Sequence, residues 1–322
     1  MSDKLKVGII GFGNIGKKHA RSLALTETAE LAAIYDPNED ISFPGITICN
    51  SIEELLADGK IDIVSVCTPN FLHEEHSIQA LQAGHHVICE KPFALTSLSC
   101  SNIIAASKKF NKRVFCVMQN RFSPVSQWLQ DLIAKQWLGE IYMVNVACYW
   151  NRNDAYYKRS DWRGNAQKDG GTLFTQFSHY VDTLYWLFGD INIENAIFAN
   201  NNHDSIDFED SCSFNFRFKN NGLGNFSYTT STFENNFEST LTIIAEKGTI
   251  KVAGQYMNEV EFINTNGLAP VVPSKTSDNI MNLSRVYQNA CASIFEGLPP
   301  STGPDDGLAV VKIIEDVYSF KK

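Results

Sequence analysis

The stretch VGIIGFGNIG, residues 7–16, decides the fold of the first part of this chain. Its apolar half is typical of a buried strand, and its second half is a glycine turn that opens a helix predicted over residues 14–25. Gly11 allows the tight turn, Gly13 lets a phosphate approach the backbone, and Gly16 lets the helix pack close to the sheet. Strand, glycine turn and helix in this order predict a dinucleotide-binding turn.

An acidic residue about 20 positions further on indicates which dinucleotide is preferred. Asp36 ends the second predicted strand, where its carboxylate can accept hydrogen bonds from ribose hydroxyls and would repel a 2′-phosphate. The sequence therefore favours NAD over NADP. The expected cofactor contacts are Gly11, Phe12, Gly13, Asn14, Ile15, Gly16 and Asp36.

Short apolar runs alternate with helical stretches up to about residue 118, which indicates a parallel sheet with helices on both faces. These strands are predicted over 4–10, 30–35, 61–66, 86–89 and 113–118. Longer alternating runs follow and predict a second, antiparallel sheet over 141–150, 212–218, 224–231 and 239–245. The fold class is therefore α/β, a doubly wound Rossmann sheet followed by an α+β domain with an open, largely antiparallel sheet. We expect an NAD-binding domain over residues 1–120 and a domain for substrate binding and oligomerisation over residues 121–322. A helix predicted over 305–320 could pack on either domain.

Composition limits the class of protein. The 322 residues are 44% hydrophobic and 20% charged, with a net charge of −9, so a general affinity for nucleic acid is not expected. No apolar run approaches the ~18 residues of a membrane helix, and no signal peptide is recognised. The eight cysteines stand singly and never as Cys-x-x-Cys, which favours buried thiols in a reducing cytoplasm over disulfides or a metal site.

A lysine directly behind a predicted strand is placed to move a proton. Lys91 follows Glu90 at the carboxyl end of strand 86–89, where open α/β sheets bind ligands. Removing a hydride from a carbinol carbon requires that the hydroxyl proton leave too, so a base must stand near the nicotinamide. Partial burial and the positive nicotinamide would both lower the pKa of a lysine, ordinarily ~10.4. Glu90 would oppose that change or hold the amine in place.

These motifs resemble the Gfo/Idh/MocA family of NAD(P)-dependent sugar oxidoreductases. The resemblance rests on GFGNIG (11–16), TPNxxH (68–73), AGHHVxCEKP (83–92), and Gly170-Gly171 followed by His179 and Asp182. It implies a Lys91-Pro92 bond that is frequently cis and an open sheet that often mediates assembly, here into a homodimer or homotetramer. It also implies Lys91 and His179 as catalytic residues, with the nicotinamide side of the cofactor lined by Thr68, Pro69, Asn70 and His73. Glu90 and Lys91 are further expected cofactor contacts.

His179 lies on a helix predicted over about 172–188, where Thr175, His179 and Asp182 would form one polar stripe. The family commonly has an acid where this chain has Thr175, with Gln176 beside it. That difference puts a full Lys-Asp-His arrangement in doubt. It leaves Lys91 as the main proton acceptor and His179 as substrate orienter or second acid/base. The His73 and His76 pair lacks metal-binding spacing, so no metal is expected.

The segment 151–168 carries five basic and two acidic residues among three aromatic ones. Such a segment suits an anionic ligand with a ring to stack, although a solvated loop against a neighbouring subunit is an equal alternative. Trp162-Arg163 also resembles the branch of the family that oxidises nucleotide sugars, the UDP-N-acetylglucosaminuronate 3-dehydrogenases. The predicted substrate contacts are Arg121, Trp162, Arg163, Thr175, Gln176 and His179.

The sequence therefore predicts an NAD-dependent dehydrogenase that oxidises a secondary sugar hydroxyl, most favourably C3 of a nucleotide-linked N-acetylated uronic acid. An inositol or free-sugar dehydrogenase of the same family is the nearest alternative. NAD-dependent glycosidase chemistry on this fold is another. A non-catalytic NAD-sensing regulator is the alternative of a different class, which the presence of both Lys91 and His179 disfavours.

Overall fold

The computed structural model describes residues 4–37, 41–266, 271–275 and 279–321. The chain forms two compact units. Unit 1 comprises Met1–Gln119 and Asp278–Val311, and unit 2 comprises Asn120–Ser277 and Lys312–Lys322. The last helix, α10 (Pro304–Tyr318), therefore contributes residues to both units.

Unit 1 contains a parallel six-stranded sheet in the order β3-β2-β1-β4-β5-β6. Its strands are β1 (Leu5–Ile10), β2 (Ala29–Tyr35), β3 (Thr47–Ile48), β4 (Ile63–Val66), β5 (His86–Cys89) and β6 (Val114–Cys116). Strands β4, β5 and β6 are almost wholly buried, which explains why they are continuous apolar runs. This topology confirms the predicted Rossmann sheet and adds the short edge strand β3.

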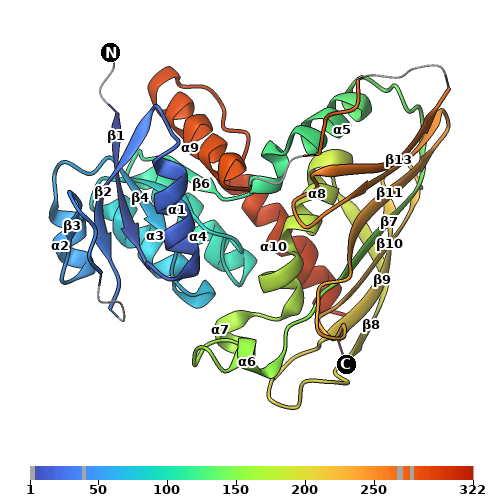
Figure 1. Ribbon diagram of the computed structural model, residues 1–322, viewed down its shortest axis with the longest axis horizontal. Helices are drawn as coiled ribbons and strands as arrows, with labels where there is room; N and C mark the ends of the chain where they lie inside the picture. The colour runs from blue at the N-terminus through green and yellow to red at the C-terminus, as the bar shows by residue number, and fades with distance from the viewer. Residues whose placement is uncertain (1–3, 38–40, 267–270, 276–278, 322) are drawn as a thin grey trace. The chain divides into compact units, whose positions relative to one another are not determined.

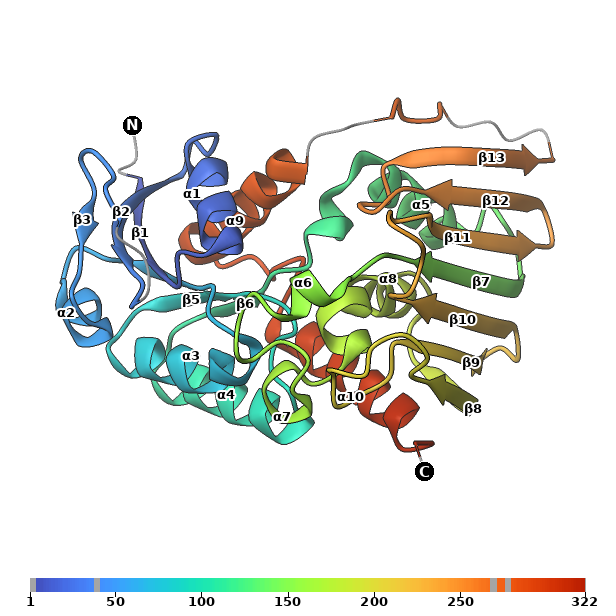
Figure 2. The same ribbon diagram turned by 60° about the horizontal axis from the view of Figure 1, so that its bottom comes forward.

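The helices of unit 1 cover both faces of that sheet. Figure 2 shows α1 and α9 on one face and α3 and α4 on the other. Local signals define several ends: the Ser51 hydroxyl accepts a hydrogen bond from Glu54 N at 3.1 Å, and Gly84 follows α3 with a φ of +94°. The bounds are α1 (Asn14–Leu23), α2 (Ile52–Ala57), α3 (His73–Gln82), α4 (Ser97–Lys109) and α9 (Asn279–Glu296).

Unit 2 contains a seven-stranded sheet in the order β13-β12-β11-β7-β10-β9-β8. Neighbouring strands are antiparallel except β7 and β10, which are parallel, so the predicted largely antiparallel sheet is confirmed. The strands are β7 (Ile141–Tyr149), β8 (Ile191–Ala199), β9 (Ser211–Phe218), β10 (Leu223–Thr229), β11 (Glu238–Ala245), β12 (Gly248–Ala253) and β13 (Glu259–Thr265).

One face of this second sheet forms the core of unit 2. A row of fully buried side chains crosses five strands in register: Phe214, Phe226, Val146, Leu241 and Val252. Figure 1 shows α5 (Pro124–Ala134) and α8 (Ser178–Phe188) on one side of the sheet. In the described part of unit 2 no helix covers the other side.

The uncovered side carries apolar residues that meet across strands. Met143 on β7 is paired with Leu223 on β10 and with Ile244 on β11, and all three are at least 40% exposed. Such a row is suited to contact with another surface. None of the described helices is both long enough and apolar enough to span a bilayer.

Candidate functional site

The glycine turn between β1 and α1 requires glycine at positions 11 and 16. Gly11 has a φ of +90°, and a Cβ there would lie 2.7 Å from the Cys67 carbonyl oxygen. A Cβ on Gly16 would overlap the Gly11 carbonyl oxygen, whereas a Cβ on Gly13 would point into open space. The turn therefore packs tightly against the chain after β4 and leaves its Gly13 side open.

This turn fits the pyrophosphate of NAD. No side chain caps the N-terminus of α1 at Asn14, and no acidic residue lies in its first turn, so its N–H groups and positive dipole are available to an anion. Phe12 and Ile15 complete the turn, and Ile15 is 38% exposed. Asp36 follows β2, and its carboxylate accepts a hydrogen bond from Phe12 N at 2.6 Å, which places it beside the turn as ribose recognition requires.

The loops after β4 and β5 are joined by a buried histidine. His73 has Nε2 at 2.9 Å from the Thr68 carbonyl oxygen and Nδ1 at 2.7 Å from the Pro92 carbonyl oxygen. Burial lowers the pKa of His73 even though both carbonyls favour its charged form. With both ring nitrogens engaged, His73 braces the Thr68, Pro69 and Asn70 loop against the loop that carries Lys91.

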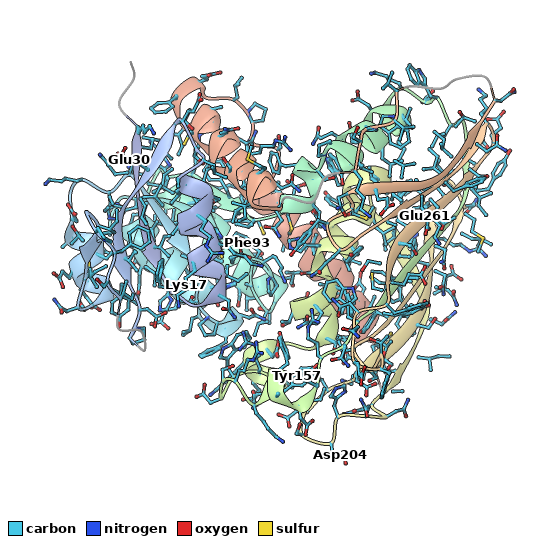
Figure 3. The ribbon with its side chains drawn as sticks, viewed as in Figure 1. Lys17, Glu30, Phe93, Tyr157, Asp204 and Glu261 are labelled. Carbon is cyan, nitrogen blue, oxygen red and sulfur yellow. The ribbon has the colours of Figure 1, made fainter. Side chains whose placement is uncertain are left out.

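Lys91 itself lies at the carboxyl edge of the unit 1 sheet and is partly exposed. Its backbone N–H donates to Glu90 Oε2 at 3.0 Å, and the Lys91-Pro92 bond is cis, as the family resemblance implied. Glu90 is only 7% exposed. Phe93, labelled in Figure 3, is fully buried against Gly307 of α10, so the chain after Lys91 is anchored in the core of unit 1.

In unit 2, a π-helical turn interrupts the helix predicted over 172–188 and places Thr175 outside the α-helical register that His179 and Asp182 share. Residues Leu173–Phe177 make a π-helical turn, and α8 starts only at Ser178, so the side chains on either side of this junction do not keep one α-helical register. Thr175 donates its hydroxyl hydrogen bond to Asp169, whereas Asp182 is fully buried. His179 lies in the first turn of α8 and is partly exposed.

Arg121, predicted to contact an anion, is paired within unit 2. Its Nε lies 3.1 and 3.0 Å from the two carboxylate oxygens of Asp182, and its Nη2 lies 2.5 Å from Oδ1. The guanidinium also lies over the Trp186 ring at 5.6 Å. Both side chains of the ion pair are at most 3% exposed, so any ligand contact of Arg121 would be shared with Asp182.

The basic and aromatic segment forms a stacked cluster in unit 2. The Arg163 guanidinium lies over the rings of Tyr156 and Trp162, at 5.1 and 4.8 Å, and Arg152 lies over Tyr156 at 5.3 Å. Gln176 accepts a hydrogen bond from Arg152 Nε at 2.7 Å and donates one to the Tyr156 hydroxyl at 2.7 Å. Arg163 Nε is buried with no hydrogen-bond partner among the described residues.

The cluster rests on an ordered support. Tyr157, labelled in Figure 3, packs with Ile206 and Phe208, and its ring meets His203 at 5.3 Å. His203 in turn lies 3.2 Å from the Asp210 carboxylate. Helix α6 (Asp154–Tyr157) is therefore fixed by one of its faces, which holds Tyr156 in place.

Two polar residues of this region were not among the predicted substrate contacts. Asp169, on the short helix α7 (Ala166–Asp169), is 1% exposed, bonds Thr175 and accepts from Gly164 N at 2.9 Å. The other is Arg152, which was predicted only as one of the basic residues of segment 151–168, and burial lowers its pKa. The sequence signal that could have identified Asp169 is its position directly before Gly170-Gly171.

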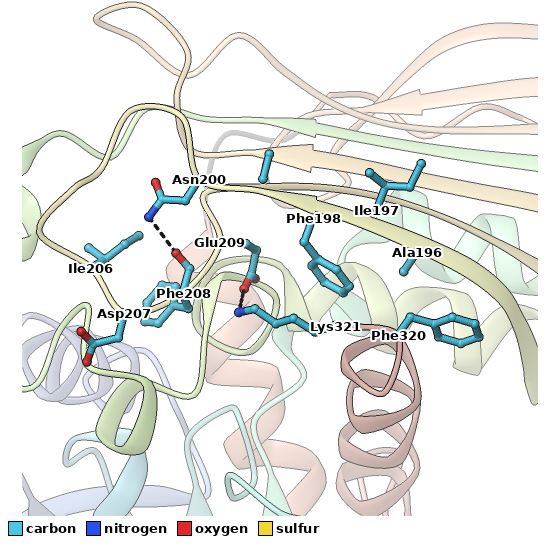
Figure 4. Close-up of a pocket in the computed structure, with 11 residues that line it drawn as sticks. Ala196, Ile197, Phe198, Asn200, Ile206, Asp207, Phe208, Glu209, Phe320 and Lys321 are labelled. Atoms are coloured by element: carbon cyan, nitrogen blue, oxygen red, sulfur yellow. Dashed lines mark hydrogen bonds and ion pairs between the residues drawn. The ribbon is translucent and has the colours of Figure 1, made fainter.

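A hollow of about 600 Å³ lies elsewhere in unit 2, beside β8 (Figure 4). Lys321 bridges to Glu209 at 3.2 Å in its wall, and Phe198 and Phe320 line it. None of the predicted site residues lines this hollow. Across the described ranges, no three His, Cys, Asp or Glu side chains gather as a metal site would need.

Both parts of the chain match known families. Residues 5–118 match the model of an oxidoreductase family with an NAD-binding Rossmann fold, and residues 126–251 match the GFO/IDH/MocA C-terminal domain. The WlbA dehydrogenase from Bordetella pertussis, crystallised with NADH and UDP-GlcNAcA, is 30% identical with a TM-score of 0.89, covering 99% of this chain and 96% of that one. The WlbA dehydrogenase from Chromobacterium violaceum, crystallised with the same two molecules, is 29% identical with a TM-score of 0.86, covering 99% and 94%.

A curated relative is the glucose-6-phosphate 3-dehydrogenase of Bacillus subtilis, 32% identical over 192 residues, which are 57% of this chain and 53% of that protein. The chain spans about half the length of the curated relatives it matches. Its likeness to the first WlbA structure, by contrast, extends over almost all of both chains. With both family domains present in order, the chain belongs to the Gfo/Idh/MocA family of oxidoreductases.

Proposed function

We propose that this protein is an NAD-dependent dehydrogenase of a secondary sugar hydroxyl. The observation that carries the proposal is the carboxyl edge of the unit 1 sheet. There, the glycine turn packs on Cys67 and Thr68 after β4, and His73 joins Thr68 to Pro92 beside Lys91. The glycine turn and Lys91 therefore lie on the loops after β1 and β5, and both loops contact the loop after β4.

Each residue has a defined part in this proposal. NAD, when bound, supplies the hydride acceptor. The Gly11–Gly16 turn and Asp36 bind and orient it, and Lys91 takes the proton from the substrate hydroxyl. His179 orients the substrate or acts as a second acid/base. These assignments treat unit 1 as the cofactor domain and unit 2 as the substrate domain.

The finer proposal is that the substrate is a nucleotide-linked N-acetylated uronic acid oxidised at C3. The stacked cluster of Arg152, Tyr156, Trp162 and Arg163 supports it, because guanidinium groups bind carboxylates and phosphates, and aromatic rings accept a sugar or base face. The partnerless Nε of Arg163 is a donor suited to such an anion. The WlbA dehydrogenases crystallised with UDP-GlcNAcA support the same class.

Mass spectrometry of paired substrates tests this function. We expect the purified protein with excess NAD to remove two hydrogens from UDP-N-acetylglucosaminuronate and to act far more slowly on UDP-N-acetylglucosamine, which lacks the carboxylate. Glucose 6-phosphate and inositol serve as the small-sugar comparison. Oxidation of inositol with an unchanged nucleotide sugar would replace the finer proposal with the free-sugar alternative, and oxidation of no sugar would contradict the dehydrogenase.

Assembly into a homodimer or homotetramer through the uncovered face of the second sheet stays a prediction. The exposed row of Met143, Leu223 and Ile244 supports it. A molar mass of a single chain by light scattering at micromolar concentration would contradict it.

A further inference from the structure

A chain of buried polar side chains leads away from Glu90 into the interior of unit 1. Glu90 Oε1 lies 2.9 Å from His19 Nε2, His19 Nδ1 lies 2.6 Å from the Tyr287 hydroxyl, and that hydroxyl lies 2.7 Å from Ser65 Oγ. His19, Tyr287 and Ser65 are each fully buried. Four side chains from four separate segments are therefore joined by three short hydrogen bonds.

The hydrogen-bond directions in this chain follow from the charge of Glu90. An ionised carboxylate only accepts, so His19 Nε2 carries the proton and donates to Glu90. In the tautomer that carries its proton on Nε2, His19 Nδ1 accepts from the Tyr287 hydroxyl, whose oxygen accepts from Ser65. Burial raises the pKa of Tyr287, which keeps it the protonated donor that this order requires. In this arrangement each of the four side chains has a hydrogen-bond partner.

Helix α9 is held so that Tyr287 cannot move away from His19. Ser284, Tyr287 and Cys291 share one face of α9, and each bonds a group at or near α1. Ser284 Oγ lies 3.0 Å from Thr26 Oγ1, and Cys291 Sγ donates to the Thr28 carbonyl at 3.7 Å. The Tyr287 ring meets the His19 ring edge-on at 5.6 Å.

His19 also links the two halves of the proposed cofactor site. It lies on α1, whose N-terminus we assign to the pyrophosphate, and it bonds the residue that precedes Lys91. Glu90 in turn accepts from Lys91 N through its other oxygen. The carboxylate is thus held from both sides, by α1 and by the backbone of the proton acceptor.

We propose that His19 and Tyr287 are positioning residues that keep the Glu90 carboxylate ionised and fixed beside Lys91, so that Glu90 sets the protonation of the Lys91 amine. The proposal deepens the proposed function and rests on Lys91 being its proton acceptor. A buried carboxylate needs such donors, because an unpaired buried charge is expensive. Removal of either positioning residue weakens the charge that stabilises the protonated amine.

The other titratable groups around Glu90 do not compete for this role. Burial raises the pKa of the Cys67 and Cys89 thiols, which favours their uncharged forms, and burial lowers the pKa of His73. The groups that face the carboxylate are Cys67, His73, Cys89, Lys91, His19 and Tyr287.

The direct test is the pKa of the Lys91 amine in the full-length protein without substrate. It is read by NMR titration of ¹³C-methylated lysines, with Lys91→Arg assigning the signal. Glu90→Gln is expected to lower that pKa by about one pH unit, because an adjacent anion favours the charged amine. His19→Leu and Tyr287→Phe are each expected to lower the Lys91 pKa by less than Glu90→Gln does. In a protein that already carries Glu90→Gln, His19→Leu should cause no further change in the Lys91 pKa.

A conservative variant and a matched control separate positioning from folding. His19→Gln keeps an N–H donor toward Glu90 and should restore the wild-type Lys91 pKa. His85 is equally buried in unit 1 and bonds the Ile61 and Leu56 carbonyls, so His85→Leu should affect stability but not the Lys91 pKa. If His19→Leu does not fold, Tyr287→Phe, which removes one hydroxyl, carries the test.

Kinetics distinguish failure of this inference from failure of the proposed function. With an active substrate, the rising limb of kcat against pH should move to lower pH in Glu90→Gln. An unchanged Lys91 pKa in Glu90→Gln, or a His19→Leu effect that persists without Glu90, would overturn the inference even in an active enzyme. If the Glu90, His19 and Tyr287 variants shift the Lys91 pKa as expected but the protein oxidises no sugar, the inference is supported and the proposed function is overturned.

Discussion

Replacing Lys91 with methionine is expected to lower kcat by roughly 10²-fold or more, because general-base catalysis by a positioned side chain contributes about that much. Methionine keeps the length of the side chain and removes the amine. The affinity for NAD should stay near its wild-type value, since the glycine turn and Asp36 are untouched. Steady-state rates and a fluorescence titration with NADH measure the two quantities on the same sample.

A matched control uses another lysine of unit 1. Lys60 is exposed and lies outside the candidate site, so Lys60→Met should change neither kcat nor the affinity for NAD. If Lys91→Met turned over at the wild-type rate, Lys91 would have no part in the proton transfer. If it lost NAD as well as activity, the lysine would be a binding residue instead.

The largest expected loss of stability comes from Asp182→Leu. The Arg121 and Asp182 side chains are at most 3% exposed, so the substitution leaves a buried guanidinium without its carboxylate. Breaking a buried pair in this way costs about 3–5 kcal/mol of unfolding free energy. Urea denaturation followed by circular dichroism is the measurement.

Two further variants show that the cost comes from the unpaired charge. The double variant Arg121→Met with Asp182→Leu should recover most of the stability, because it removes both charges. Asp190 pairs with Lys219 on the surface, with both side chains more than 60% exposed, so Asp190→Asn should cost less than about 1 kcal/mol. A small cost for Asp182→Leu would mean that the pair is not buried as described.

The parts of the fold that local chemistry determines were predictable from the sequence. Strand β1, the glycine turn after it and Asp36 lie within the 32 residues from Leu5 to Asp36, and the need for glycine at position 16 comes from the Gly11 carbonyl oxygen of the same turn. The end of α3 at Gly84 is of the same kind. Such features need no knowledge of distant residues, which is why the pattern alone located them.

The features that escaped prediction depend on distant partners or on a break in helical register. His19 meets Tyr287 across 268 positions, and Arg121 meets Asp182 across 61, so no local pattern joins them. The π-helical turn at Leu173–Phe177 takes Thr175 out of the register predicted with His179 and Asp182, because the prediction assumed 3.6 residues per turn. The parallel pairing of β7 with β10 likewise depends on strand order.

The most direct test of the central claim is hydride transfer from the sugar to the cofactor. UDP-N-acetylglucosaminuronate carrying deuterium at C3 is mixed with excess protein and NAD in a single turnover, and the reduced cofactor is analysed by mass spectrometry. The account predicts reduced cofactor that carries the deuterium, together with a 3-keto sugar that has lost it. Reduced cofactor without deuterium, or labelled sugar recovered intact from active protein, would contradict it.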